Sequence, residues 1–452
     1  MRRAPLQLLL VLTAGQRLLT LLLLRPGGFI YDYSDYIFYH LIARYAAEGF
    51  YPFIHYWMEY PPLWPWLNVG LYRLSLLVPS WDDPRLVHSV LIGLTLLPFD
   101  LGGLILLYRL GERMWGRARA TWLAAVWALL FMPLYIWSGW FDPILLFLLL
   151  LSTWFVVQGR PTAAGVAAGV GAMVKLTPAL VLVTALPVWR RRGAPLWGWG
   201  STGILRALAA FGAVVLAISL PFLLINPAMF VAMLRSLGAR GSWETVWALL
   251  DGFYGFGVVG ADRFDPAAAA AAPPSRVPWV LVYLGFAVLG LWLWTRPWDW
   301  RQPRVQVAFT GLVVTLFMLW SRGWSPQFLV WLLPWLLLVW PDRRGLLLAL
   351  ALTALAAAEL IFFARWTATP SILAALIVLR TAGLVIVAVA AYRLLRAEPG
   401  LRPPFLPEKG ESFEGHQRNP SPFLPGVLSE SAPSRVGEGA IRPSPPRRRG
   451  SP

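Results

Sequence analysis

The sequence predicts an all-α protein that crosses a membrane many times. Of its 452 residues, 58% are hydrophobic and only 13% are charged, whereas soluble domains carry roughly 25% charged residues. Many apolar runs approach the ~20 residues that a helix needs to span a hydrocarbon core. A soluble globular protein is therefore excluded, and we expect a bundle of about 11–13 transmembrane helices.

About twelve apolar segments follow one another along residues 1–396, which we expect to form one membrane-embedded domain. Short arginine-rich connections orient them, because positively charged loops stay in the cytoplasm. Two long loops, 25–62 and 226–278, then lie on the external side. In chain order the segments are 6–24, 63–79, 86–107, 121–137, 143–157, 162–189, 203–225, 279–295, 305–320, 327–340, 345–363 and 372–392.

Two segments do not fit a simple alternation of sides. The run 162–189 has Arg160 before it and Arg190 after it, so we expect a hairpin broken near Lys175, where glycines and a proline interrupt the helix. The run 63–79 follows an external loop, but the next cytoplasmic loop comes only after a further span. We therefore expect this run to dip into the outer leaflet without crossing.

The net charge of +17 does not indicate a nucleic-acid partner. Nucleic-acid-binding proteins gather basic residues into a patch or stripe, whereas here they are divided among short loops. The absence of cysteine excludes disulfides and thiolate metal sites. Segment 397–452 is rich in proline and poor in large hydrophobic residues, so we expect a disordered cytoplasmic tail.

The first external loop holds most of the polar candidates for a site. Residues 31–60 contain 8 of the 14 tyrosines, and Asp32 and Asp35 precede a helix that we expect to run along the membrane surface over 36–47. Aromatic rings stack on the apolar face of a sugar, and carboxylates accept hydrogen bonds from its hydroxyls. The alternative is an interfacial aromatic belt with no substrate.

Three further residues close this loop and are candidates for substrate binding. They are His55, Glu59 and Tyr60, which stand just before two prolines. The prolines fix the chain where it enters the bilayer and remove two donors that lipid could not satisfy. A plain helix-entry turn is the alternative interpretation.

Lys175 is the most conspicuous charged residue inside an apolar segment. A lysine at the membrane centre costs about 2.5–3.5 kcal/mol, so such residues usually have a partner or a function. At an external hairpin apex Lys175 would meet an anionic lipid head group, although simple snorkelling to the surface is the alternative.

The short external loops supply three weaker candidates for substrate binding. Asp142 precedes a proline at the start of a span, where helix capping is the better explanation. Arg322 is one of few external arginines, and an arginine is well suited to contact a phosphate. Gln327 lies in the same loop as Arg322.

The order of these motifs resembles the glycosyltransferase-C superfamily, and within it glycosyltransferase family 87, the polyprenyl-phosphate-mannose-dependent α-mannosyltransferases. The resemblance spans about residues 6–392 and leaves out the tail. The motifs that carry it are Asp35-Tyr36-x-x-Tyr39, Tyr60-Pro-Pro-Leu63, Gly139-x-x-Asp142, Lys175-x-x-Pro178 and Ser325-Pro-Gln327.

The resemblance implies a glycosyltransferase-C bundle with membrane-surface helices in its first external loop. It implies transfer of a sugar, mannose, from a polyprenyl-phosphate donor to a lipid-linked or cell-surface glycan, with inversion at the anomeric carbon. The general base would be Asp35, which the tyrosine pattern favours, and Asp32 stays open as an alternative. Lys175 and Arg322 would stabilise the phosphate that leaves.

The same interpretation implies partners and a location. The enzyme would lie in the plasma (inner) membrane, in contact with membrane lipid, with its active site on the external face. We expect no metal, no other cofactor and no nucleic acid. Two alternatives remain: a multi-span transporter or flippase for a lipid-linked sugar, and an oligosaccharide-lipid ligase or polymerase.

Overall fold

The computed structural model describes residues 4–23, 35–79, 83–189, 202–252, 262–363 and 367–397. Within these ranges the chain is almost entirely helical, and the only β structure is two isolated bridges. Asp32 and nearly all of the predicted tail lie outside the described residues.

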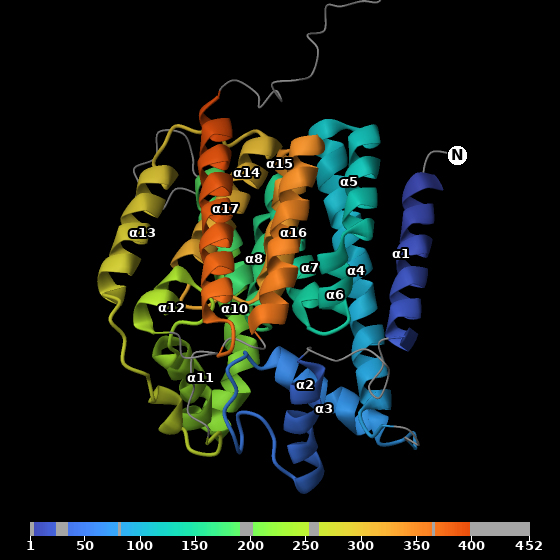
Figure 1. Ribbon diagram of the computed structural model, residues 1–452, viewed down its shortest axis with the longest axis vertical. Coiled ribbons are helices and arrows are strands. Elements are labelled where there is room, and N and C mark those ends of the chain that lie inside the picture. The colour runs from blue at the N-terminus through green and yellow to red at the C-terminus, as the bar shows by residue number, and fades with distance from the viewer. Residues whose placement is uncertain are drawn as a thin grey trace, which may run out of the picture. The chain divides into compact units, whose positions relative to one another are not determined.

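The helices occur in the order in which Figure 1 labels them. The first nine α-helices are α1 Ala4–Leu23, α2 Tyr36–Arg44, α3 Leu63–Ser75, α4 Leu86–Trp115, α5 Arg117–Leu129, α6 Phe131–Trp137, α7 Asp142–Val157, α8 Pro161–Ala172 and α9 Val181–Trp189. The others are α10 Thr202–Ile225, α11 Pro227–Ala239, α12 Val246–Asp251, α13 Trp279–Trp294, α14 Pro303–Trp320, α15 Leu329–Val339, α16 Arg343–Phe363 and α17 Pro370–Arg396. Four short 3₁₀ helices are η1 Tyr45–Glu48, η2 Thr177–Leu180, η3 Ala268–Ala270 and η4 Pro326–Phe328.

Six of the described helices are long and apolar enough to cross a membrane, namely α1, α4, α10, α14, α16 and α17. The bent pair α5 and α6 makes a seventh candidate if it is counted as one span. Five shorter apolar helices include α7, α13 and α15. The predicted all-α polytopic class is confirmed, and the predicted 11–13 spans are reached only when these shorter helices are counted as well.

The predicted span 121–137 is wrong as a single helix. It forms α5 and α6, which meet at an angle of 55°, and Leu130 between them is extended. Pro133 supplies the physical reason. It has no N–H for the carbonyl of Leu129, four residues earlier, and its ring clashes with that carbonyl, so the helix breaks there.

The break predicted near Lys175 is confirmed, and the paths of the two irregular segments through the membrane stay predictions. Helix α8 ends at Ala172, and η2 and α9 resume the helical path after a break over 173–176 that contains Lys175. Helix α3 has only 13 residues, a length of about 20 Å, which is too short for a ~30 Å hydrocarbon core.

The first helix is fastened to the bundle by a buried ion pair. Arg17 of α1 donates from Nε to Asp100 Oδ2 of α4 at 2.9 Å, and both side chains are almost fully buried. Figure 1 shows α1 alongside α4.

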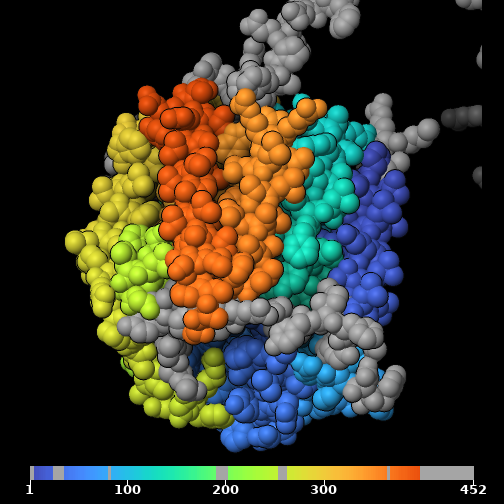
Figure 2. Space-filling model, viewed as in Figure 1, coloured from blue at the N-terminus to red at the C-terminus, as the bar shows by residue number. Residues whose placement is uncertain are grey.

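Helices α16 and α17 lie side by side (Figure 2), and each leaves large apolar side chains exposed, as a lipid-facing helix does.

The loop predicted to be the first external one folds over one end of the long helices. Helix α2 continues into η1 and stops at Gly49, whose φ of 88° is in the left-handed region, so the predicted helical stretch over 36–47 is confirmed. Figure 1 shows α2, α3 and α11 gathered at this end. Apolar residues of the loop pack on Phe230 and Met233 of α11, which brings the two predicted external loops together.

Candidate active site

Asp35 is held at the start of α2 by contacts with neighbouring segments. Its backbone N–H donates to the carbonyl of Gly139 at 3.2 Å, which ties α2 to the loop between α6 and α7. One turn along α2, the Tyr39 hydroxyl donates to Asp35 Oδ2 at 3.3 Å. The carboxylate therefore has a fixed position, while the residue is only partly buried.

The surroundings of Asp35 raise its pKa from 3.8 to about 7. Burial is the largest cause, because it disfavours the charged form, and the negative charges of Asp142 and, more weakly, Glu59 act in the same direction. The ammonium of Lys175 and the hydrogen bond from Tyr39 lower the pKa and partly compensate. A carboxyl group with a pKa near neutrality is well matched to accepting a proton as a general base.

Aromatic rings form a continuous wall beside Asp35. The Tyr39 ring lies edge-on to Trp64 with centroids 5.0 Å apart, and Trp64 stacks on Phe141 at 4.6 Å. Tyr60 meets the same Phe141 ring edge-on at 5.0 Å. Such a wall is suited to the apolar face of a sugar ring.

Lys175 lies against the opposite charge of Asp142. Its Nζ is 3.2 Å from Asp142 Oδ1, and the indole N–H of Trp331 donates to the same oxygen at 2.8 Å. Asp142 is fully buried, and its Oδ2 has no hydrogen-bond partner among the described residues. The backbone N–H of Leu63 donates to the carbonyl of Met173 at 3.1 Å, which ties the start of α3 to the break that carries Lys175.

Four aromatic rings surround the Lys175 ammonium. Nζ lies 4.6 Å from the ring centroid of Trp331 and 4.8 Å from that of Phe328, and these two rings stack on each other at 4.2 Å. The Phe141 and Tyr60 rings follow at 5.3 and 5.8 Å. Only 14% of the lysine side chain is exposed. Cation–π attraction of this kind holds an ammonium in place once it is desolvated.

The structure thus brings together Asp35, Tyr60, Asp142 and Lys175, which we call the Asp35–Lys175 site. The charges of Asp142 and Lys175 are close enough to shift the pKa of Asp35. The Phe141 ring contacts both Tyr39, which is bound to Asp35, and the Lys175 ammonium. Tyr60 contacts Phe141 and Lys175. A carboxyl group, a cation and a wall of rings therefore converge although 140 positions separate Asp35 from Lys175.

Two of the loop residues have other contacts. Glu59 forms an ion pair with both terminal nitrogens of Arg263, a residue of the second external loop. Its pKa is lowered, because the charge and hydrogen bonds of Arg263 outweigh the effect of burial. His55 is exposed, and its Nδ1 accepts from the backbone N–H of Tyr51 at 2.9 Å in the same turn. Within the described part of the chain the contacts of His55 are with Tyr51 and Phe50, so it lies apart from Asp35 and Lys175.

Arg322 is not part of the Asp35–Lys175 site. Its Nε donates to the Tyr283 hydroxyl at 2.8 Å, and its Nη1 donates to the carbonyl of Gly238 at 2.7 Å. The guanidinium also lies over the Trp279 ring at 4.7 Å. Gln327, in contrast, is buried next to Phe328, and its Oε1 has no partner within the described ranges.

Sequence analysis did not find every residue near the site. The charge of Arg240, in the second external loop, acts on Glu59, Tyr60 and Lys175, so this arginine is the second cation there. An arginine in a predicted external loop was the available signal. The rings of Phe328 and Trp331 follow the Ser325-Pro-Gln327 motif at a spacing of one helical turn, but only the fold shows that they meet Lys175.

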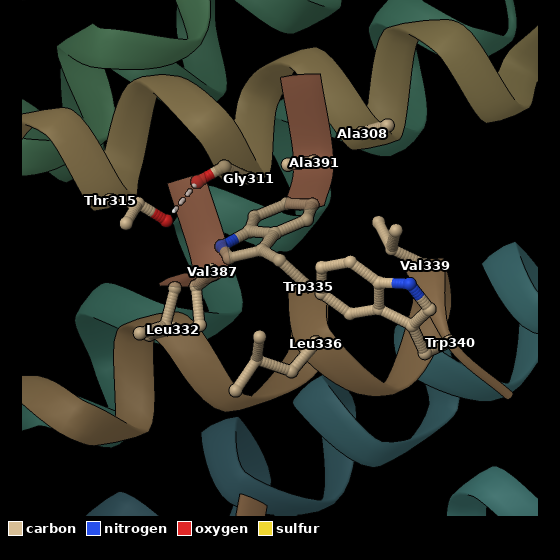
Figure 3. Close-up of a pocket in the computed structure, with 10 residues that line it drawn as sticks. All are labelled: Ala308, Gly311, Thr315, Leu332, Trp335, Leu336, Val339, Trp340, Val387 and Ala391. Atoms are coloured by element: carbon tan, nitrogen blue, oxygen red, sulfur yellow. Dashed lines mark hydrogen bonds between the residues drawn. The ribbon is translucent and has the colours of Figure 1, made fainter. Parts of the chain in front are cut away.

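A small apolar pocket lies elsewhere, between α14, α15 and α17. Figure 3 shows the Trp335 ring between Gly311 and Val387, with Leu336 next to it in α15 and Trp340 just past the end of that helix. Its lining offers the Thr315 hydroxyl, which donates to the carbonyl of Gly311, and no charged group. The pocket therefore lacks the side chains that acid–base chemistry requires.

The fold is that of a membrane-embedded helical protein with a cluster of charged and aromatic side chains at one end of its helices, and comparison with known proteins assigns its class. Glycosyltransferase family 87 matches residues 71–321, more than half of the sequence. The chain belongs to this family and is a membrane glycosyltransferase, as the resemblance of its motifs predicts. A comparison with curated proteins finds no match.

Among solved structures the chain is similar to the crystal structure of ArnT from Cupriavidus metallidurans bound to undecaprenyl phosphate. The two share 16% sequence identity over 87% of this chain and 78% of that chain, with a TM-score of 0.45.

Proposed function

We propose that this glycosyltransferase moves a sugar, mannose, from a polyprenyl-phosphate donor to a lipid-linked or cell-surface glycan. The observation that carries the proposal is the juxtaposition of a carboxyl group of pKa about 7, Asp35, with an ammonium held in an aromatic cage, Lys175. A base and a phosphate-binding cation are the two groups that this reaction needs.

The reaction is an inverting single displacement. Asp35 takes the proton of the acceptor hydroxyl while the hydroxyl oxygen forms a bond to the anomeric carbon of the donor. The bond from that carbon to the phosphate oxygen breaks on the opposite face, and its electron pair leaves with the polyprenyl phosphate. A positioned base typically contributes about 10² to 10⁴-fold to such a rate.

Lys175 and Arg240 would stabilise the negative charge that develops on the leaving phosphate. In the structure Lys175 is paired with Asp142, so binding of a phosphate would share the ammonium between two anions. We assign this role to Arg240 and not to Arg322, because the charge of Arg240 acts on Lys175 and Tyr60, whereas the Arg322 guanidinium contacts Tyr283 and backbone carbonyls away from them.

The proposal includes a location and a set of partners. The enzyme would lie in the plasma (inner) membrane with the site on the external face, because the arginine-rich loops orient the opposite ends of the helices to the cytoplasm. No metal or other cofactor is needed when the cationic side chains stabilise the negative charge of the phosphate. Membrane lipid and the acceptor glycan are the other partners.

The test is transfer of a labelled sugar from polyprenyl-phosphate mannose by the purified full chain in lipid vesicles. Asp35→Asn is expected to reduce kcat by about 10² to 10⁴-fold, with little change in donor KM. Lys175→Met is expected to reduce kcat and to raise donor KM. Glu48→Gln, at an exposed carboxylate of the same loop, is the matched control and should retain activity.

Two outcomes would contradict the proposal. Full activity in Asp35→Asn together with loss in Asp32→Asn would assign the base to Asp32. The second outcome is a wild-type protein that uses no polyprenyl-phosphate sugar but transfers sugar from a diphosphate-linked donor. The donor would then be a lipid diphosphate sugar, and the proposed donor would be wrong.

A further inference from the structure

A second group of buried charges lies beside the Asp35–Lys175 site, between α16, α17 and the loop that precedes α12. It consists of Glu244, Glu359 and Arg380, and their exposed fractions are 1%, 0% and 2%. None of the three has a part in the proposed reaction. We call them the Glu244–Glu359–Arg380 cluster.

Among the described residues, one acid of the cluster forms an ion pair with Arg380 and the other forms none. Arg380 Nη1 donates to Glu359 Oε2 at 2.8 Å, and the Trp324 indole N–H donates to the same oxygen at 3.0 Å. Arg380 Nη2 donates to the backbone carbonyl of Glu244, not to its carboxyl group. Glu244 Oε1 and Glu359 Oε1 are both buried without a partner in the described part of the chain.

The charge count of the cluster does not balance if both acids are ionised. Two carboxylates would then share one guanidinium at a place with almost no access to water, and burying an unpaired charge is costly. The pKa of Glu244 is accordingly raised well above its usual value, by burial first and then by the charge of Glu359, with Arg380 opposing. A proton on Glu244 removes the imbalance.

The cluster is linked to the active site by two short paths. In the first, Trp324 contacts both Glu359 and Arg380, its ring meets Phe328 at 6.1 Å, and Phe328 borders Lys175. These contacts connect α17 to the aromatic cage of the lysine.

The second path runs through the loop that carries Arg240. Glu244 has a φ of 48°, which is uncommon for a residue other than glycine. The preceding Trp243 pairs with Gly323 through backbone hydrogen bonds to the neighbouring residues Arg322 and Trp324. The Arg240 guanidinium lies over the Trp243 ring at 3.9 Å, so a shift of this loop would displace Arg240.

We infer that Glu244 is a neutral acid inside a buried cluster with ionised Glu359 and Arg380, and that this cluster is a positioning device for Arg240 and Phe328 beside Lys175. Its catalytic part rests on the proposed function, whereas the protonation of Glu244 does not. The three residues position other groups and do not touch substrate.

The first test uses infrared spectroscopy on the full chain in lipid and needs no substrate. All chains in this comparison, the wild-type reference included, carry Asp35→Asn, because Asp35 with its pKa of about 7 would contribute a carboxylic acid band of its own at neutral pH. A protonated carboxylic acid has a C=O stretching band separate from the bands of carboxylates, and the reference is expected to show such a band at neutral pH. Glu244→Gln should remove it. Glu359→Gln should also remove it, because Glu244 then pairs with Arg380 and loses its proton. Glu112→Gln, at an exposed glutamate of α4, is the control and should leave the band unchanged.

The second test compares stability and activity of the same substitutions in the chain that keeps Asp35. Glutamine resembles a neutral glutamic acid in shape, so Glu244→Gln should keep the unfolding temperature and kcat/KM close to those of wild type. Glu359→Gln should lower both, and the loss in kcat/KM should be about tenfold or more, mainly through donor KM, since small displacements of binding groups are costly. The double variant should be worse than Glu359→Gln, because it leaves Arg380 without an acid.

The inference is overturned if the carboxylic acid band survives in Glu244→Gln, or if Glu244→Gln is as damaging as Glu359→Gln. If Glu359→Gln does not fold, the infrared comparison of the reference with Glu244→Gln still decides the protonation state. If no polyprenyl-phosphate sugar is a substrate, the band and the unfolding temperatures still test the cluster, and only the proposed function fails.

Discussion

The Asp35 carboxyl lies between charges of opposite sign, and each acts on its protonation. Asp142 raises its pKa and Lys175 lowers it, while burial has the largest effect. Asp142 and Lys175 are also bound to each other. Asp35, Lys175 and Asp142 are therefore electrostatically coupled, and changes at one residue should be measurable at another.

Removal of the Asp35 charge should stabilise the protein in a pH-dependent way. A carboxyl group whose pKa is higher in the folded state than in the unfolded state destabilises the fold when it ionises. Asp35→Asn should therefore unfold at a higher temperature than wild type, and the difference should grow from about pH 4 to about pH 7 and then level off. Thermal unfolding in detergent at several pH values measures it. A difference that shrinks as the pH rises would contradict the raised pKa.

The pH dependence of transfer should shift in opposite directions in two variants. Because a base must be deprotonated, kcat/KM of wild type should rise with pH and reach a plateau above about 7. Asp142→Asn removes a negative charge that raises the pKa of Asp35, so the midpoint should move to lower pH. Lys175→Met removes a positive charge that lowers this pKa, so its midpoint should move to higher pH. Shifts in the same direction would show that another group sets the profile.

At the scale of the elements, the position of Lys175 depends on the close packing of α8 against α10. Gly165 of α8 lies so near the backbone of Ala207 in α10 that an added Cβ would overlap a carbonyl oxygen. Backbone atoms cannot move aside as a flexible side chain can. Close helix contact through small residues is common in membranes, and here it sets the direction in which α8 approaches the break at 173–176.

Substitution of Gly165 should accordingly separate the two helices. Gly165→Ala is expected to lower the unfolding temperature and to reduce transfer activity, with a loss of stability of about 1–3 kcal/mol, as in other overpacked sites. The control is Gly212→Ala in α10, where an added Cβ meets nothing within 4 Å. It should be neutral or slightly stabilising, because alanine favours a helix more than glycine does. Equal effects of the two substitutions would contradict this packing.

Hydropathy located the elements well but not all their ends or bends. The break near Lys175 was predictable, since glycines and Pro178 interrupt a helix. Helix α4 extends to Trp115, beyond the predicted end at 107, because its last two turns carry Arg109, Glu112 and Arg113, which are polar yet favour a helix. Hydropathy measures the part of a helix that lies in lipid, so it does not report such an extension.

At the scale of the whole molecule, residues from both external loops and several helices assemble the site. Asp35, Asp142 and Lys175 could be predicted because a charge beside apolar sequence is unusual on its own. Arg240, Phe328 and the Glu244–Glu359–Arg380 cluster could not, because an external arginine or one more aromatic residue is ordinary in this chain. Their importance comes only from where the fold places them.

The side of the membrane on which the site lies is testable because the chain has no cysteine. Single substitutions then give unique thiols. Glu48→Cys lies at an exposed position of the loop that follows α2, and Arg117→Cys lies at the exposed start of α5, in a predicted cytoplasmic connection. A membrane-impermeant maleimide should label Glu48→Cys in intact cells and should label Arg117→Cys only after permeabilisation.

Both variants replace exposed charged side chains, so each should keep transfer activity, which confirms that the labelled protein is folded. The arginines between α4 and α5 predict this orientation, since such clusters remain on the cytoplasmic side. The reverse labelling pattern would place Asp35 and Lys175 on the cytoplasmic face. The donor phosphate and the acceptor hydroxyl would then have to be presented from the inner leaflet, and the proposed external transfer would be wrong even if the chemistry at Asp35 were right.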